Sequence, residues 1–340
     1  MVLSRQLPPT PVRESVGRLA DDLRRVRVNT EAVETTAAEW ADREFELPAW
    51  RAPVFPDERQ PGVTPADVFD FMFVGNAINF AFREFETGRK FTAEYDGHEW
   101  RGAFGMWACL KRAHDTGIPI TSEQFLADLS RDDFDDLFTP VDGTQLPLAT
   151  ERYEILTGLG ERLVAAEGER FHDLFETESV ALYDDGFGFV DELVERFPSF
   201  RDEWRVETTD DHMTVRFDKR GQLLAGMLFG RFGDGWFSIE SPTSFSVFAD
   251  YNLPNVLRSL GILEYDSALA EEVDAGRPLE PGSRPEVELR AATLLAADEL
   301  AVQLSRSRDR PVTGPELDYA LFQARDGVET EPHRCRTTAY

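Results

Sequence analysis

The sequence predicts a mainly α-helical protein that folds as a single compact domain with a small antiparallel sheet. Three observations lead to this prediction. Apolar residues recur at helical spacing along most of the chain, one short segment carries a clear hairpin signal, and no repeat or linker divides the sequence. The 340 residues are 41% apolar and 11% aromatic, which is enough for a sizeable buried core.

The N-terminal part, residues 1–62, is predicted to contain two helices and a loop. Regular apolar spacing predicts the first helix over residues 12–26, and Thr30 can cap the second. The proline-rich residues 47–63 then form either a linker or a loop that lines a site. The main body of the domain is expected to cover residues 63–340.

The clearest strand signal lies in residues 91–100, where two short runs flank Asp96 and Gly97. An Asp-Gly pair favours the tight type I′ turn that joins antiparallel strands, so this segment predicts a β-hairpin. Helical spacing resumes on both sides of it. The other predicted helices cover residues 68–82, 103–116, 121–129, 151–166, 189–197, 220–229, 253–260, 267–275, 287–304 and 315–324.

The chain is strongly acidic, with 64 acidic and 36 basic residues and a formal charge of -28. Lysine occurs only as Lys90, Lys111 and Lys219, so arginine carries nearly all of the positive charge. This composition is typical of a salt-adapted protein, because the guanidinium group is weakly hydrated and pairs well with acids. The absence of a basic stripe argues against a nucleic-acid partner.

Cysteine usage and apolar windows indicate the compartment. The chain has two cysteines, Cys109 and Cys335, which fits a reducing cytoplasm. Its N-terminal residues carry no apolar signal core, and no apolar window is long enough to span a bilayer. We therefore expect a cytoplasmic monomer that does not contact membranes.

Common catalytic motifs are missing from the sequence. The five histidines are scattered, and there is no HExxH or CxxC motif, so we expect no metal site. There is also no GxSxG elbow, no Walker loop, and no GxGxxG after a strand. The sequence thus predicts a reaction that uses neither a metal ion nor a cofactor.

Three segments combine aromatic, carboxylate and amide side chains: Asn79-Phe80, residues 248–254 and residues 317–319. An aromatic residue beside a carboxylate suits a flat heteroaromatic ligand, because the rings stack while the carboxylate accepts N–H bonds. Structural roles explain the same residues equally well. Asp250 precedes a predicted helix start, and Asp318 lies in a predicted first helical turn, where acids are common.

A series of segments in order resembles the queuosine salvage family, the queuosine 5′-phosphate N-glycosylases. The resemblance covers nearly the whole chain and is weakest between residues 31 and 62. The segments are PVRESVGRLA, FVGNAINFAF, YDGHEWRGAFGMWACLKRAHDTGIPITS, LPLATER, FPSFRDE, FADYNLPNVLRSLGILEY, SRPEVELRAATL, LDYALF and HRCR. The resemblance implies a helical fold similar to DNA glycosylases. It also implies metal-free cleavage of a nucleotide into queuine and ribose 5-phosphate, which salvages the base for tRNA modification.

By this resemblance, the FADY segment places the key carboxylate at Asp250. That carboxylate is expected to stabilise the positive charge that develops on the ribose, or to orient the attacking water. A 7-deazapurine lacks N7, so the leaving base needs help at its pyrimidine edge. Asp318 is expected to accept N–H bonds from this edge, with Phe248 and Tyr319 clamping the ring and Gln323 adding an amide contact.

Lys219 and Arg220 are the candidates for binding the 5′-phosphate, because a helix start and cationic groups both favour an anion. A solvated surface pair is the competing interpretation of these two residues. The chain departs from the resemblance at Arg83, where a tryptophan is expected, and at Gln323, where an acid is expected. The base, queuine or a precursor, and the choice between nucleoside and nucleotide therefore stay open.

Other classes of function fit parts of the sequence. A non-catalytic carrier of a deazapurine nucleotide or nucleobase would keep the aromatic residues without needing Asp250. A helical interaction protein would carry an exposed apolar patch and no deep pocket. A DNA glycosylase would need a basic track, which this acidic chain lacks.

Overall fold

The computed structural model describes residues 7–166, 170–208, 211–233, 235–308 and 310–340, and the predicted mainly helical fold is confirmed. The helices of these residues are α1 Pro11–Leu19, α2 Thr30–Glu39, α3 Pro65–Ala77, α4 Ala103–Asp115, α5 Glu123–Ala127, α6 Arg131–Leu137, α7 Ala149–Ala165, α8 Phe189–Arg196, α9 Lys219–Phe232, α10 Asn252–Ser259, α11 Ser267–Asp274, α12 Arg284–Arg306 and α13 Gly314–Ala324. None of the described helices is long and apolar enough to cross a membrane.

The strands of the described residues form three separate two-stranded antiparallel sheets. These pair β1 Val26–Val28 with β6 Leu263–Tyr265, β2 Thr92–Tyr95 with β3 His98–Arg101, and β4 Glu203–Glu207 with β5 His212–Arg216. The hairpin predicted around Asp96 and Gly97 is confirmed as β2–β3. Both turn residues have positive φ angles, 51° and 72°, as a type I′ turn requires.

The helix predicted over residues 12–26 is wrong beyond Leu19. There the chain makes one short 3-10 turn and then extends into β1. The carboxylate of Glu288 accepts hydrogen bonds from the backbone N–H groups of Arg24 and Arg25, at 2.9 and 2.6 Å. Tertiary contacts with α12 and pairing with β6 therefore override the local helical spacing.

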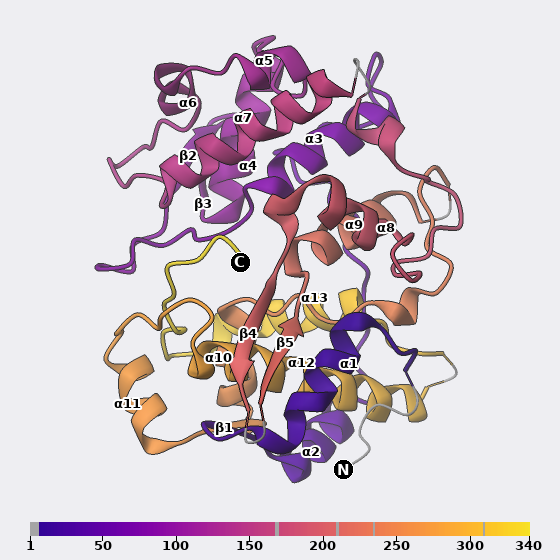
Figure 1. Ribbon diagram of the computed structural model, residues 1–340, viewed down its shortest axis with the longest axis vertical. Coiled ribbons are helices and arrows are strands. Elements are labelled where there is room, and N and C mark those ends of the chain that lie inside the picture. Colours follow the sequence, from indigo (N-terminus) through magenta and orange to yellow (C-terminus); the bar gives the residue numbers. More distant parts are fainter. Residues whose placement is uncertain (1–6, 167–169, 209–210, 234, 309) are drawn as a thin grey trace.

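Two hydrophobic cores divide the molecule, and Figure 1 shows them as an upper and a lower group of helices. We call the first the aromatic half; α3, α4, α7, α8 and α9 build it, and its buried side chains include many phenylalanines. The second is the aliphatic half, built by α1, α2, α10, α12 and α13. Its buried side chains are mostly Val, Leu, Ile and Ala.

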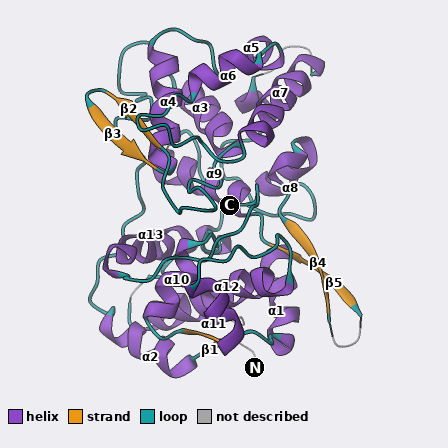
Figure 2. Cartoon of the chain, turned by 90° about the vertical axis from the view of Figure 1, so that its left-hand side faces the viewer, coloured by secondary structure: helices purple, strands orange, loops and turns teal. Residues whose placement is uncertain are grey.

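Figure 2 shows α9 between the two groups of helices, and the loop of residues 245–250 before α10 contributes side chains to both cores, Phe245 and Phe248 to one and Val247 and Ala249 to the other. Asn79 after α3, Asn252 at the start of α10 and Pro315 at the start of α13 line one cavity at this junction. Side chains from both cores therefore face a common space.

Candidate active site

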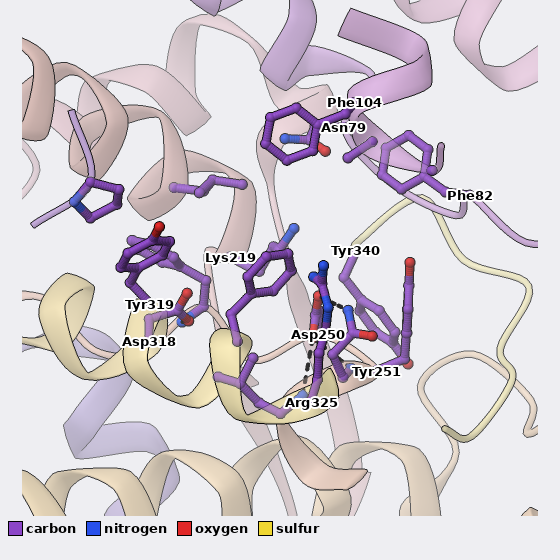
Figure 3. A pocket seen from close by; sticks show the side chains of 18 of the residues that line it. Asn79, Phe82, Phe104, Lys219, Asp250, Tyr251, Asp318, Tyr319, Arg325 and Tyr340 are labelled. Carbon is purple, nitrogen blue, oxygen red and sulfur yellow. Dashed lines mark hydrogen bonds between the residues drawn. The ribbon is translucent and has the colours of Figure 1, made fainter. Parts of the chain in front are cut away.

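A cavity of about 180 Å³ opens at the junction of the two halves. Apolar and aromatic side chains form most of its wall, and charged groups reach it from both halves (Figure 3). The aromatic half contributes Trp50, Asn79, Phe82, Phe104, Trp107, Lys219, Leu223 and Gly226. The aliphatic half contributes Leu253, Pro315, Asp318, Tyr319, Phe322 and Arg325, with Phe248, Asp250, Tyr251 and Asn252 from the joining loop and Tyr340 from the C-terminal segment.

Asp250 lies at the cavity wall immediately before α10. Its Oδ1 accepts hydrogen bonds from the backbone N–H groups of Asn252 and Leu253, at 2.6 and 3.2 Å, and its Oδ2 accepts one from Asn252 Nδ2 at 2.9 Å. The carboxylate thus has the helix-entry role that its position in the sequence allows, and it also faces the cavity. These N–H groups fix the orientation of the carboxylate.

Asp318 enters the cavity from the first turns of α13. Its Oδ1 accepts a hydrogen bond from the backbone N–H of Phe248 at 2.7 Å. Burial, together with the negative charge of Asp250, raises the pKa of Asp318 to about 8, although the Phe248 bond and the charge of Lys219 act in the opposite direction. At neutral pH Asp318 therefore carries a proton, and Oδ2 is the oxygen free to donate it.

Lys219 begins α9, and its side chain is only 7% exposed. Burial lowers the pKa of Lys219, while the charges of Asp250 and Asp318 raise it in part. No described carboxylate lies within ion-pair distance of its ammonium group, which projects into the cavity in Figure 3. The two acids and this buried cation thus form one electrostatically linked group.

Phe248 is held against α9 by a close approach at Gly226. A β-carbon at position 226 would lie 2.7 Å from Phe248 Cζ, so only glycine leaves room for this ring. Tyr319 lines the cavity beside Asp318 on α13. Both aromatic residues chosen from the sequence therefore reach the cavity, where flat walls and a few polar groups suit a heteroaromatic ligand.

A buried ion pair outside the cavity lining holds the backbone next to Asp250 and Lys219. Arg290 of α12 binds Asp202 through both guanidinium nitrogens, at 2.9 and 2.5 Å, and its Nε donates to the carbonyl of Ala249 at 3.1 Å. Asp202 Oδ2 also accepts from the backbone N–H of Lys219 at 3.2 Å. The pair therefore connects the residue before Asp250 to the start of α9.

Two residues expected to contact the ligand lie outside the cavity lining. Gln323 sits on the exposed face of α13, where its Oε1 accepts a bond from Arg43 at 3.4 Å, because α13 turns Asp318 and Phe322 inward instead. Arg220 is 1% exposed, and its guanidinium donates to the carbonyls of Ala77 and Ser199 within the aromatic half. These two side chains have structural partners in place of a ligand.

Several lining residues were not selected from the sequence. The proline-rich residues 47–63 form a loop that lines the site, because Arg231 of α9 donates to the carbonyls of Trp50 and Pro56, both at 2.5 Å. Phe82, Phe104, Lys90, Arg325 and Tyr340 were also missed, whereas Asn79 and Tyr251 lie in segments that the sequence singled out without giving these two residues a role. One signal was available: of three lysines in the chain, Lys90 and Lys219 line this cavity.

Among the described residues, no group of three or more His, Cys, Asp or Glu side chains is arranged to hold a metal ion. Protein groups that can act on a ligand here are therefore carboxylates, cationic side chains, amides and aromatic rings. Together they define a helical protein whose ligand pocket is lined by aromatic rings, two acids and a buried lysine.

Comparison with known proteins identifies the family. The model of the family described as "Queuosine salvage protein" matches residues 59–340, and the chain belongs to that family. It is 32% identical to the queuosine 5′-phosphate N-glycosylase/hydrolase of Sphaerobacter thermophilus over 95% of each chain. It is 31% identical to the Mus musculus protein of the same name, over 98% of this chain and 99% of that one. The predicted family resemblance is confirmed.

Proposed function

We propose that this chain hydrolyses the N-glycosidic bond of queuosine 5′-phosphate and releases queuine and ribose 5-phosphate. The observation that carries this proposal is that Asp250 and Asp318 line the same aromatic pocket in different electrostatic surroundings. The chain is also similar along its length to enzymes named for this reaction. Two carboxyl groups with different surroundings, of which burial raises the pKa of Asp318, match the needs of a glycosidic hydrolysis.

Asp250 acts on the sugar. As the C1′–N bond lengthens, its electron pair passes to the base and positive charge builds up on the ribose. A carboxylate fixed by three N–H bonds before α10 stabilises this charge without rearranging, and it can orient the attacking water and accept its proton. The hydroxyl group of that water completes ribose 5-phosphate.

Asp318 acts on the base. Because its pKa is raised to about 8, its free oxygen donates a hydrogen bond at neutral pH, where an ordinary aspartate would only accept one. A 7-deazapurine has no N7 to protonate, so a proton delivered to another nitrogen of the ring offsets the charge left by the broken bond. Phe248 and Tyr319 then hold the ring beside this donor.

The composition of the chain supports proposals about its compartment, oligomeric state and partners. We propose that the chain works as one domain and as a cytoplasmic monomer, on a small nucleotide and not on a nucleic acid. Support comes from the formal charge of -28 and the absence of a basic stripe in the sequence. The same acidity supports adaptation to high salt.

A non-catalytic nucleotide carrier is the second candidate. The observation in its favour is that Asp250 is already engaged by three local N–H groups, as a purely structural helix-entry residue would be. Such a protein would bind the nucleotide without releasing the base.

Base release distinguishes the two functions. Purified protein is incubated with queuosine 5′-phosphate, and queuine is followed by chromatography for the wild type, Asp250→Asn and Asp266→Asn. Asp266 is a matched control, because it caps α11 by accepting from Leu269 N at 2.7 Å and does not line the cavity. We expect Asp250→Asn to slow release by about 100- to 1,000-fold and Asp266→Asn to leave it unchanged. Tight binding by the wild type without release would support the carrier.

A further inference from the structure

The chain enters α9 through a strained turn. Phe217 and Asp218 alone separate the end of β5 at Arg216 from Lys219, the first residue of α9. Asp218 makes this abrupt change of direction by adopting the left-handed conformation, with a φ of 50° and a ψ of 36°. A residue with a β-carbon adopts this conformation at a cost in free energy, so the surrounding structure must hold it there.

The side chain of Asp218 does not cap its own helix. Asp266, which precedes α11, shows the ordinary arrangement: its backbone is extended, and its carboxylate accepts a hydrogen bond from Leu269 N at 2.7 Å. The Asp218 carboxylate instead accepts from the Nε of Arg216 and, at 3.3 Å, from the hydroxyl of Tyr183. Helix capping therefore does not explain why an acid stands at position 218.

Fixed partners hold both the side chain and the main chain of Asp218. The residue is fully buried, which raises its pKa to about 7 against the opposing charge of Arg216. Arg216 is held in turn by Asp191, whose Oδ1 accepts from its Nη2 at 3.1 Å. The carbonyl of Asp218 accepts from Gln222 N at 2.9 Å and so begins the hydrogen bonding of α9. The turn is thus locked from two directions.

The conformation of Asp218 determines where Lys219 points. Lys219 lies on the same face of α9 as Leu223 and Gly226, and all three line the cavity. Because Lys219 is the first helical residue, the turn before it sets the rotation at which this face begins. The charges that most affect the pKa of Lys219 are those of the two cavity acids and not that of Asp218. Asp218 therefore acts on Lys219 through the backbone.

We propose that Asp218 is a positioning residue, which holds the entry turn of α9 so that the Lys219 ammonium faces the cavity acids Asp250 and Asp318 (Figure 3). Its effect on catalysis rests on the proposed function, whereas its effect on Lys219 does not. The role requires two properties, tolerance of the left-handed conformation and a side-chain oxygen that accepts from Arg216. Asparagine has both properties, and alanine has neither.

The first test is a double-mutant cycle. The kcat/KM of base release from queuosine 5′-phosphate is measured for the wild type, Asp218→Ala, Lys219→Met and the double variant. We expect Asp218→Ala to lower kcat/KM by about 10- to 100-fold when Lys219 is present, because the amine is misplaced. It should change kcat/KM by less than about twofold when Lys219 is already replaced. Asp218→Asn should stay within about threefold of the wild type.

The second test measures Lys219 directly and needs no turnover. The chain has three lysines, so trace acetylation with acetic anhydride, followed by mass spectrometry of the peptides, reports each amine separately. We expect Asp218→Ala to speed acetylation of Lys219 by at least about threefold, because its turn loosens, and to leave Lys111 unchanged. Asp96→Ala is the matched control, because Asp96 has a φ of 51° in the exposed β2–β3 turn and does not line the cavity.

Three outcomes would overturn the positioning role. These are an equal loss of kcat/KM with and without Lys219, an unchanged acetylation rate of Lys219, or a loss in Asp218→Asn as large as in Asp218→Ala. Asp218→Gly, which adopts the turn without strain but lacks the oxygen, provides the same comparison if Asp218→Ala does not fold. If the wild type releases no base yet Asp218→Ala selectively exposes Lys219, the proposed function fails and the positioning role stands.

Discussion

The aromatic and aliphatic halves each bury an apolar core, but they fill it with different side chains. In the aliphatic half, Phe45 and Phe217 are the buried aromatic residues among those described, whereas rings stack and tilt against one another throughout the aromatic half. Phe73 and Phe171, for example, stack with centroids 4.4 Å apart. Large rings leave broad flat surfaces at the edge of a core, and branched aliphatic side chains fill space more evenly.

This difference separates two tasks at the cavity. The aromatic half provides most of the flat wall through residues such as Phe82, Phe104 and Trp50. The aliphatic half holds the two acids, Asp250 in the loop just before α10 and Asp318 on α13. One half thus determines which ligand shape fits, and the other determines the chemistry.

Removing the support behind the acids is expected to have the largest effect. Arg290→Met leaves Asp202 buried without its partner and frees the carbonyl of Ala249, so we expect a loss of about 3–5 kcal/mol in the free energy of unfolding. Urea denaturation measures it. Arg258→Met, which breaks the more exposed pair with Asp274, should cost about 1 kcal/mol or less. Similar losses in both variants would show that the buried pair contributes no more to folding than an exposed one.

Changing Asp318 tests the chemistry assigned to the aliphatic half. We expect Asp318→Asn to lower base release by about 10- to 100-fold at pH 7. In the wild type, release should fall as pH rises through about 8, because Asp318 then loses its proton. The pH–rate profile of the variant should lack this alkaline decline. A wild-type profile that is flat across this range would contradict a proton-donating role.

The same titration affects stability. The pKa of Asp318 is about 8 in the folded chain and close to 3.8 when unfolded, so the folded state holds a proton that the unfolded state releases. The contribution of Asp318 to stability therefore falls as pH rises from about 4 to about 8. The unfolding free energy of Asp318→Asn, relative to the wild type, should increase over this range.

A smaller effect is expected from reshaping the flat wall. Gly226→Ala places a methyl group 2.7 Å from Phe248 Cζ, so the ring must shift and KM should rise several-fold with a modest change in kcat. Gly158→Ala is the control, because no atom lies within 4 Å of its β-carbon in α7. It should stabilise the chain by about 0.5–1 kcal/mol. An unchanged KM in Gly226→Ala would show that the position of Phe248 does not affect ligand binding.

The sequence predicted most helices and the β2–β3 hairpin, because apolar spacing and the Asp96-Gly97 turn are local signals. It did not predict β4 and β5. Their alternating positions carry mostly charged or polar residues, and only Val206 and Val215 are fully buried. The pairing of β1 with β6 depends on residues more than two hundred positions apart, for which local spacing gives no information.

The site was predicted in part for the same reason. Asp250, Phe248, Asp318, Tyr319 and Lys219 lie in segments whose composition or family resemblance could be read directly, and all five line the cavity. Which face of α13 turns inward could not be read, so Gln323 was chosen in place of Phe322 and Arg325. Cavity residues contributed by distant loops carry no local pattern that distinguishes them from core residues.

The position of the cavity at the seam between two cores also concerns the lifetime of the protein. A bound nucleotide touches both halves and acts as a removable cross-link, because a ligand present at one hundred times its Kd stabilises the folded state by about 2.7 kcal/mol. We therefore expect a ligand that fills this cavity to slow proteolysis of the folded chain, because it adds contacts to both cores at once.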